Sequence, residues 1–303
     1  MSATIHRPRV AVLGMGNMGQ ALATRLLAQG YDVSVWNRSA RDLSALTELG
    51  ARSLASLVGL WGIADVVITF VADDNALRAV CLGPGGILIQ SDNQGLLIDM
   101  STVSPTASEE ISRAASDAGV DYLRSPVSGN PLVLAAGNLT LVVSGPSDVF
   151  ERAHELLNSI GPNVLYVGDK EQARLVKIAI NAGLAITTEL LAELIVLTES
   201  YGLDRATFLD VVGQSVLGSP FVKYKTTGLN QRDYTATFTT ALLAKDLRLA
   251  LDLADDAELT LPAVALVASL VGDALNGFAD VDFAALLPHL QRTHGLNPDI
   301  PPT

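Results

Sequence analysis

In the first half of the chain, short hydrophobic runs rich in β-branched residues alternate with segments whose apolar residues recur at helical spacing. The runs lie at residues 10–13, 32–36, 65–71, 96–100, 139–144 and 163–167. The helical patterns include residues 20–30, 106–118 and 147–160, and residues 82–95, rich in glycine and polar residues, are expected to form a surface loop. Such alternation is typical of a parallel, doubly wound sheet. We therefore predict an α/β domain over residues 1–167.

Beyond residue 167 the strand pattern disappears and only helical patterns remain. Residues 168–202 contain no proline, start at Gly168 and stop at Gly202, so they predict one helix roughly 50 Å long. A helix of this length is expected to link two domains. Further helices are predicted at residues 204–214, 239–254, 262–275 and 282–291, with a loop or broken helix at 219–237 and a frayed tail, NPDIPPT. The second domain, residues 168–303, is therefore predicted to be all-α.

The composition of the chain limits its class of function. A chain of 303 residues, 49% of them hydrophobic, fits two domains, and a net charge of −12 without a polybasic run argues against a nucleic-acid partner. Cys81, the only cysteine, excludes an intramolecular disulfide and fits a reducing cytoplasm. The first residues lack the apolar core of a signal peptide, and the longest apolar run, residues 259–272, is too short to span a bilayer. We expect a cytoplasmic protein without a membrane partner.

A glycine-rich segment follows the first predicted strand directly. It reads Gly14-Met15-Gly16-Asn17-Met18-Gly19 and opens a predicted helix. In this context Gly14 permits a tight turn, Gly16 lets the backbone approach a pyrophosphate, and Gly19 allows the helix to pack closely on the strand. The amide groups at the start of the helix are donors for the anion. These residues therefore predict a dinucleotide-binding site.

The end of the second predicted strand indicates which dinucleotide binds. An acidic residue there would accept hydrogen bonds from an adenosine ribose 2′-hydroxyl, whereas this chain has Asn37, Arg38 and Ser39. A guanidinium group donates charge-assisted bonds to a phosphate. We therefore predict NADP rather than NAD as the cofactor.

Two hydroxyl-bearing loops follow later strands. Ser101 and Thr102 come after the strand at 96–100, where ligands of open α/β sheets collect, although they also have the composition of a helix cap. Ser128, Gly129 and Asn130 follow a short strand, and their backbone amides and hydroxyl suit a carboxylate, although this composition is also that of a simple β-turn. These loops are candidates for contact with the cofactor and the substrate.

Lys177 is the best candidate for a proton carrier. A nicotinamide reaction moves a hydride and also a proton, and none of the four histidines lies at a predicted strand tip or beside the glycine-rich loop. No H-E-x-x-H motif or cysteine cluster exists either, so no metal site is expected. Lys177 and Asn181 project from one face of the long helix among apolar neighbours, and an apolar setting lowers the pKa of an amine toward the working range. The alternative for Lys177 is a solvated surface lysine.

Together these segments resemble the motifs of the β-hydroxyacid dehydrogenases, a family that includes 3-hydroxyisobutyrate dehydrogenase and glyoxylate/succinic semialdehyde reductase. In family order they are GMGNMG, DMSTVSP at Asp99–Pro105, SPVSGN at Ser125–Asn130 and KIAIN at Lys177–Asn181, and Lys245-Asp246-Leu247 is similar to a fifth motif. The resemblance covers nearly the whole chain. It implies a Rossmann domain followed by an all-α domain after a long helix, and a homodimer or homotetramer formed through the helical domain.

The resemblance also implies a role for each motif. The reaction would interconvert a small β-hydroxyacid and its semialdehyde or ketoacid with NADP. Ser128 and Gly129 would hold the substrate carboxylate, Lys177 would be the general acid/base, and Asn181 would bind the substrate. Lys245 would close over the nicotinamide, and Ser101 and Thr102 would line it.

The sequence departs from the family pattern at two places. Arg124 and Ser125 stand where an acidic or small residue is usual, and Asn130 replaces the second glycine of the substrate loop. Because Asn130 adds a side chain beside the expected carboxylate, an imine reductase or reductive aminase of related fold stays open as an alternative, although those enzymes generally lack the lysine. A non-catalytic nucleotide-binding module is a second alternative. Ile180 stands where 6-phosphogluconate dehydrogenase has a histidine, which excludes that activity.

Overall fold

The chain forms two compact units, Met1–Lys177 and Ile178–Thr303. The computed structural model describes residues 7–90 and 95–300. The expected surface loop at 82–95 therefore lies partly outside the described residues, as do the last three residues of the tail. The division between the units falls inside helix α7 (Gln172–Ser200), whereas the predicted domain boundary precedes that helix.

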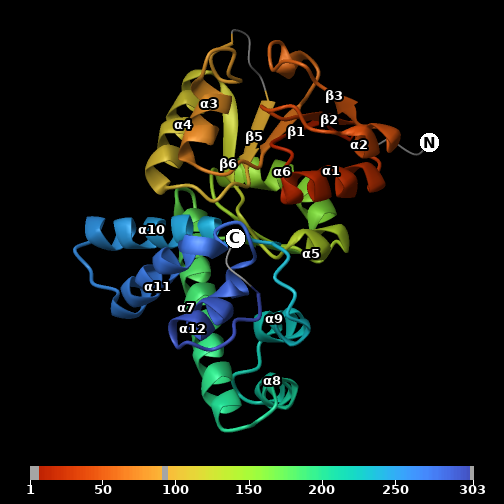
Figure 1. The fold of residues 1–303 in the computed structure, drawn as a ribbon. Helices are drawn as coiled ribbons and strands as arrows, with labels where there is room; N and C mark the ends of the chain where they lie inside the picture. Colours follow the sequence, from red (N-terminus) through yellow and green to blue (C-terminus); the bar gives the residue numbers. More distant parts are fainter. Residues whose placement is uncertain (1–6, 91–94, 301–303) are drawn as a thin grey trace. The chain divides into compact units, whose positions relative to one another are not determined.

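A six-stranded parallel sheet forms the centre of the first unit (Figure 1). Its order is β3-β2-β1-β4-β5-β6, so the direction of the winding reverses between β1 and β4. Leu13, the last residue of β1, pairs with Trp36 of β2 and Thr69 of β4, which aligns the carboxyl ends of these strands. The strands are β1 Val10–Leu13, β2 Val33–Trp36, β3 Arg52–Ser53, β4 Val66–Thr69, β5 Gly95–Asp99 and β6 Val120–Arg124. The predicted doubly wound fold is confirmed.

Helices cover both faces of this sheet because β1 is apolar on both sides. Val10 and Val12 pack with residues of α1 and α6, whereas Ala11 and Leu13 pack with residues of α3 and α4. Figure 1 shows α1 and α6 on one side of the sheet and α3 and α4 on the other. The helices of this unit are α1 Asn17–Ala28, α2 Ser44–Glu48, η1 Leu60–Gly62, α3 Asp74–Leu82, α4 Pro105–Asp117, α5 Pro131–Ala135 and α6 Ser147–Ile160.

Cys81 belongs to the core between the sheet and α3. Its side chain is 0% exposed and packs in the same cluster as Leu77 and Val80. Burial raises the pKa of its thiol well above the ordinary value. The only cysteine of the chain is therefore an apolar core residue in the folded state.

A smaller three-stranded sheet completes the first unit. It consists of β7 Val127–Ser128, β8 Thr140–Val143 and β9 Asn163–Tyr166. β7 pairs antiparallel with β8, and β8 pairs parallel with β9. The short helix α5 between β7 and β8 was not predicted. It forms because Asn130 caps its first turn and Pro131 occupies the first helical position.

The second unit is all-α, as predicted. α7 begins at Gln172 rather than at the expected residue 168, because Gly168 has φ +140° and Lys170 N–H donates to the Gln172 side chain (2.7 Å). At the other end Gly202 adopts φ +81° and stops the helix as expected. The other helices are α8 Arg205–Gln214, α9 Pro220–Gln231, α10 Thr240–Asp256, α11 Pro262–Phe278, η2 Phe283–Ala285 and α12 Leu286–Thr293.

α9 replaces the loop or broken helix predicted for residues 219–237. Ser219 Oγ accepts a hydrogen bond from Val222 N–H (3.2 Å), and Pro220 fills the first turn. The helix ends at Gln231, and Arg232 follows with φ +52°. The cap and the proline thus start a helix despite its polar composition.

Asp299 anchors the tail, which was expected to be frayed. Its side chain is 2% exposed, forms an ion pair with Arg205 and accepts a hydrogen bond from Tyr234 Oη–H (2.7 Å). Its backbone N–H donates to Gln291 Oε1 (2.9 Å). Burial opposes ionisation of Asp299, but the hydrogen bonds from Arg205 and Tyr234 outweigh burial and lower its pKa. The described part of the tail is therefore fixed to the helical unit.

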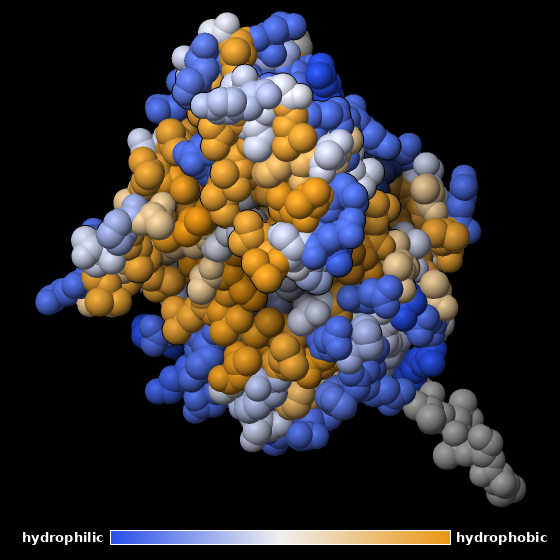
Figure 2. Space-filling view, turned by 90° about the horizontal axis from the view of Figure 1, so that it is seen from below, coloured by the Kyte–Doolittle hydropathy of each residue, from blue (hydrophilic) through white to orange (hydrophobic). Residues whose placement is uncertain are grey.

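α7 carries apolar residues around most of its circumference. Among the helices of the described residues it alone is long and apolar enough to cross a membrane, and 44% of its most apolar 18-residue window is buried within the structure. Its exposed apolar side chains include Ile180 (37%), Leu190 (41%) and Leu197 (53%). Figure 2 shows that apolar residues, in orange, gather over much of the face seen from below. Both the fully buried and the exposed positions of α7 therefore carry apolar side chains.

Candidate cofactor and active site

The glycine-rich loop lies directly after β1, at the carboxyl end of the sheet. Gly14 has φ +103°, and a Cβ atom built there would lie 2.3 Å from Phe70 O. A Cβ atom at Gly19 would lie 1.9 Å from Gly14 O. Both contacts are far shorter than real Cβ contacts, so packing of the loop requires glycine at these two positions.

Gly16 has different surroundings. Apart from Gly16 itself and its neighbours in the chain, no described residue has an atom within 4 Å of a Cβ built at this position. Gly16 is the N-cap residue of α1 and has no side-chain hydrogen bond to the first turn. Gly16 and Asn17 are exposed and Met18 is half-buried. The first amides of α1 thus face open space, as the binding of a pyrophosphate requires.

Asn37 joins the glycine-rich loop to the end of β2. Its Oδ1 accepts a hydrogen bond from Met15 N–H (2.9 Å), and its Nδ2 donates to Ser39 O (3.0 Å) and Ser39 Oγ (3.2 Å). The amide of Asn37 is therefore committed to holding the loop. Arg38 beside it is exposed and has no hydrogen bond or ion pair within the described part of the chain. At this strand tip Arg38 is the side chain available to a ligand.

Ser101 and Thr102 follow β5 and differ in accessibility. Ser101 is 0% exposed, and its Oγ accepts a hydrogen bond from Val71 N–H (2.9 Å). The hydroxyl of Ser101 therefore joins the loops that follow β4 and β5. Thr102 is half-buried. The capping role considered for these residues falls to Ser104, whose Oγ accepts from Ala107 N–H (3.0 Å) at the start of α4.

The loop Ser128-Gly129-Asn130 joins β7 to α5. Gly129 is exposed and has φ +141°, and a Cβ atom there would lie 2.7 Å from Leu139 Cδ1. Asn130 Oδ1 accepts a hydrogen bond from Val133 N–H (3.0 Å) and so caps α5. The added side chain of Asn130 is thus turned into the helix, and the Ser128 side chain is half-buried. Glycine at 129 and the cap at 130 leave the loop backbone open to a ligand.

Lys177 lies in the second turn of α7 and is half-buried. Its apolar neighbours are only partly enclosed, since Leu175 is 46% and Ile180 is 37% exposed. Lys177 is the last residue of the first unit, which also contains the glycine-rich loop and the loop at Ser128. The unit therefore carries both a primary amine and the loops expected to bind cofactor and substrate.

Asn181, Asp246 and Lys245 form a cluster in the second unit. Asn181 is 2% exposed, and its Nδ2 donates to Asp246 Oδ2. Lys245 Nζ lies 2.8 Å from Asp246 Oδ1, an ion pair without a well-directed hydrogen bond. Asp246 was not assigned a role from the sequence, although it follows Lys245 directly in the quoted motif. It connects the two candidate residues of this unit.

Two further ion pairs near the start of α7 were not predicted. Arg124, at the end of β6, is 4% exposed and pairs with Glu171, with Nε to Oε1 at 2.8 Å. Arg174, in the first turn of α7, is 1% exposed and pairs with Asp99 at the end of β5. The unusual Arg124 thus contacts the segment before α7 rather than standing alone in the substrate loop.

No metal site is evident in the part of the chain that the structure describes, where no group of three or more His, Cys, Asp and Glu residues is arranged to hold an ion. His154 contacts Asn158 on α6, and His289 is largely buried on α12. Burial lowers the pKa of His289, and the nearby Arg292 lowers it further.

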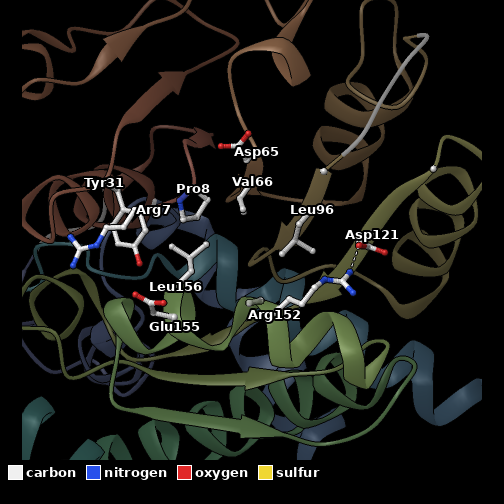
Figure 3. Close-up of a pocket in the computed structure, with 13 residues that line it drawn as sticks. Arg7, Pro8, Tyr31, Asp65, Val66, Leu96, Asp121, Arg152, Glu155 and Leu156 are labelled. Carbon is white, nitrogen blue, oxygen red and sulfur yellow. Dashed lines mark hydrogen bonds and ion pairs between the residues drawn. The ribbon is translucent and has the colours of Figure 1, made fainter. Parts of the chain in front are cut away.

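A cavity of ≈ 600 Å³ in the first unit lies away from these residues (Figure 3). Its walls include Val66, Leu96 and Asp121, which are at the amino ends of β4, β5 and β6. Arg152 and Leu156 of α6 line it as well, and Arg152 forms an ion pair with Asp121. Ligands of open α/β sheets bind at the carboxyl ends of the strands, so this cavity is not the candidate site.

A doubly wound sheet with this glycine-rich loop at its switch point, followed in the chain by an all-α unit, defines a dinucleotide-binding oxidoreductase. Residues 9–168 match the family model described as the NAD binding domain of 6-phosphogluconate dehydrogenase. Residues 172–290 match the one described as NAD-binding of NADP-dependent 3-hydroxyisobutyrate dehydrogenase. The chain belongs to the β-hydroxyacid dehydrogenase family.

Named relatives agree with this membership over almost the whole chain. An uncharacterised oxidoreductase, YfjR, of Bacillus subtilis is 34% identical over 282 residues, 92% of this chain and 98% of its own. The 3-hydroxyisobutyrate dehydrogenase of Pseudomonas aeruginosa is 32% identical over 284 residues, 91% of this chain and 95% of its own. The chain is therefore an enzyme, an NAD(P)-dependent hydroxyacid dehydrogenase.

Solved structures show the same similarity. The Mycobacterium tuberculosis 3-hydroxyisobutyrate dehydrogenase with L-serine has a TM-score of 0.82 at 27% identity, covering 94% of this chain and all of its own. Psf3 with NADP+ and 2-OPP has a TM-score of 0.86 at 26% identity, covering 93% of this chain and 99% of its own. A reductive aminase of Aspergillus terreus with NADPH covers 94% of this chain and 100% of its own, but at 21% identity and a TM-score of 0.63 it shares the fold alone.

Proposed function

We propose that the enzyme uses NADP to interconvert a small β-hydroxyacid and its semialdehyde or ketoacid, with Lys177 as the general acid/base. The observation that carries the proposal is the combination of Lys177 with the exposed Gly129 loop in one unit of a hydroxyacid dehydrogenase. The glycine at 129 and the capped Asn130 keep that backbone open to a carboxylate. Substrates with one carboxylate close to the reacting carbon are therefore expected.

The bound nicotinamide would supply or accept the hydride, and the residues of the chain would handle the proton and the carboxylate. In reduction, the Lys177 ammonium donates a proton to the oxygen that becomes the hydroxyl, which prevents the build-up of alkoxide charge. In oxidation, the neutral amine accepts the hydroxyl proton. Ser128 Oγ–H and the amides of the loop donate to the carboxylate, and Asn181 and Lys245 are further candidates for contact with the substrate and the cofactor.

Turnover by Lys177→Ala is the decisive measurement. Wild type and variant are assayed spectrophotometrically with small semialdehydes, 2-ketoacids and cyclic imines, each with NADPH and NADH. We expect wild-type turnover of the carboxylate-bearing carbonyl compounds and a loss of about 10²–10⁴-fold in kcat for the variant. Lys170→Ala, at an exposed lysine before α7, is the matched control and should retain activity. Equal turnover by wild type and Lys177→Ala would show that Lys177 is not the general acid/base. Turnover of imines alone would show that the substrates are imines rather than hydroxyacids and their carbonyl counterparts.

The NADP preference rests on Arg38, which is exposed beside a neutral Asn37 whose amide is already engaged. A charge-assisted bond to a 2′-phosphate contributes about 1.5–3 kcal/mol, so Arg38→Asp should raise the KM for NADPH about 10- to 100-fold and leave that for NADH nearly unchanged. Arg113→Asp, a charge reversal on α4, serves as the control. An unchanged KM for NADPH in Arg38→Asp would show that the 2′-phosphate binds elsewhere.

The proposal extends to assembly and location. The exposed apolar side chains of α7 support association of two copies through the helical unit, since association would remove them from water. A single cysteine, buried as a thiol, suits a reducing compartment and supports a cytoplasmic enzyme.

A further inference from the structure

Arg174 lies at the centre of a buried polar network in the first unit. Its guanidinium pairs with the Asp99 carboxylate, and its Nη1–H donates to Ser101 O (2.6 Å). Its Nε–H donates to Ser108 Oγ and a second Nη2–H donates to Tyr122 Oη, both at 3.2 Å. The planar fork of one arginine thus contacts β5, α4 and β6 at once.

Asp99 extends the same network to β4. Its Oδ1 accepts hydrogen bonds from Thr69 Oγ1–H (2.7 Å) and from Ser101 N–H (3.0 Å). Asp99, Thr69 and Ser101 are each 0% exposed. The carboxylate therefore has a partner on each oxygen, and the arginine is fixed in direction rather than merely neutralised.

The network fixes the first turn of α7, on which Lys177 depends. Residues 174 and 177 are three apart on one helix, so their side chains lie on neighbouring parts of the same face. Arg174 is directed toward the ends of β5 and β6, and its direction sets the rotation of α7 about its axis. That rotation determines where the half-buried Lys177 points. Arg124 and Glu171 form a second attachment, just before the helix.

We propose that Arg174 and Asp99 are positioning residues that aim Lys177 and hold the loop carrying Ser101 and Thr102. The proposal rests on the proposed function, since it requires Lys177 to be the proton carrier. Neither residue is expected to contact the substrate, because both are buried and fully engaged. Their contribution to kcat passes through Lys177, and this contribution should disappear when Lys177 is absent.

A double-mutant cycle tests this coupling. Arg174→Met, Lys177→Ala and the double variant are compared with wild type in kcat and in KM for NADPH. Displacement of a reacting group by about 1 Å can cost about 100-fold in rate, so Arg174→Met should lower kcat by up to that factor and leave the KM for NADPH within about threefold. The double variant should be no slower than Lys177→Ala.

Three outcomes separate the possibilities. If Lys177→Ala has wild-type turnover, the proposed function fails. If Lys177→Ala is slow but Arg174→Met keeps wild-type kcat, or if the two losses multiply in the double variant, the positioning role is wrong. Asp99→Asn keeps the shape of the side chain but loses its charge, so it should reproduce the loss of kcat seen in Arg174→Met. Arg174→Lys should retain part of the kcat that Arg174→Met loses. If Arg174→Met does not fold, Arg174→Lys replaces it in the cycle.

Arg205→Met is the matched control for lost stability. It removes a buried arginine that pairs with Asp299 and Glu199 in the second unit, outside the proposed machinery. It should lower the melting temperature by an amount similar to that for Arg174→Met and leave kcat unchanged. If Arg205→Met lowers kcat as well, the losses of kcat in Arg205→Met and in Arg174→Met both result from general destabilisation.

Discussion

Gly16 and Gly19 are three residues apart at the start of α1 and have opposite surroundings. A Cβ at Gly19 would collide with Gly14 O. A Cβ at Gly16 would have no described residue within 4 Å, apart from Gly16 itself and its neighbours in the chain. We therefore propose that a ligand requires the first glycine, whereas packing requires the second. The sequence motif does not distinguish the two glycines, whereas their surroundings in the structure do.

Alanine at these two positions should have different effects. Gly19→Ala should lower the melting temperature of the apo protein by several degrees, because a contact of 1.9 Å forces the helix away from the loop. Gly16→Ala should leave that temperature within about 1 °C but reduce the stabilisation by added NADPH, since stabilisation by a ligand rises with the logarithm of its affinity. Thermal unfolding with and without NADPH measures both. Loss of apo stability in Gly16→Ala would contradict the assignment of that space to a ligand.

Glu189 on α7 should make stability depend on pH. It is 6% exposed, and burial, followed by the nearby Glu193 carboxylate, raises its pKa to about 7. The folded state then holds a proton between about pH 4.5 and 7 that the unfolded state releases, so stability falls as pH rises through this window. Glu189→Gln should lessen this loss of stability by about 2 kcal/mol. This value is smaller than the free energy of the whole pKa shift, because the carboxyl group is partly solvated.

The measurement is denaturant unfolding at pH 5.5 and pH 8. Wild type should lose stability between these values, and Glu189→Gln should lose less. Glu193→Gln is the comparison, because it removes only the smaller of the two causes and should have a weaker effect. Identical pH profiles for wild type and Glu189→Gln would show that the carboxyl group is ionised in the native protein.

At the scale of elements, α5 and α9 share the local signal that starts them. Asn130-Pro131 and Ser219-Pro220 each place a capping side chain before a proline in the first turn. We did not predict α5, because Asn130 was interpreted as a substituted glycine, and for residues 219–237 we predicted a loop or broken helix. In both places the capping residue and the proline start a helix although the composition of the segment does not favour one. This capping signal is local and is present in the sequence.

Asn130 should therefore be replaceable by another capping residue. Asn130→Ser should keep stability and activity, whereas Asn130→Ala should cost about 1 kcal/mol and raise the substrate KM more than it lowers kcat, because α5 supports the Gly129 loop. Denaturant unfolding and steady-state kinetics check the two variants. If Asn130→Ala behaves like wild type, the cap does not shape the loop.

Most strands of the parallel sheet and the glycine-rich loop could be predicted from the sequence because their signals are local, whereas the order of the strands comes from the structure. β1 and its neighbours are short apolar runs, and the loop follows β1 directly. The ion pairs at α7 could not be predicted in this way. Arg174 and Asp99 are 75 residues apart, and Arg124 and Glu171 are 47 apart, so only the fold brings them together. The anchored tail has the same cause, since Asp299 meets Arg205 94 residues away.

At the scale of the whole molecule, we propose that the exposed apolar stripe of α7, which includes Leu190 and Leu197, is the basis for assembly. Leu190 and Leu197 are two helical turns apart on one face and are 41% and 53% exposed. We expect the 31.8 kDa chain to behave as a dimer or larger in light scattering after size exclusion. Leu190→Glu with Leu197→Glu should shift it toward the monomer and leave the helical content unchanged, because charge would then be buried at the interface.

Val58→Glu provides the control for this prediction. Val58 is 73% exposed in the first unit, away from α7 in the chain, and its replacement should leave the mass unchanged. A wild-type mass near 31.8 kDa would mean that the stripe stays in water. Dissociation by Val58→Glu instead would move the interface to the first unit.

The buried Cys81 also gives the chain a built-in reporter. Because it is the only cysteine and is 0% exposed, a thiol reagent can react only when the core beside α3 opens. The rate of modification therefore measures the opening free energy of the first unit separately from the second. The same feature allows one new surface cysteine to be labelled with a dye under native conditions while the natural thiol stays silent.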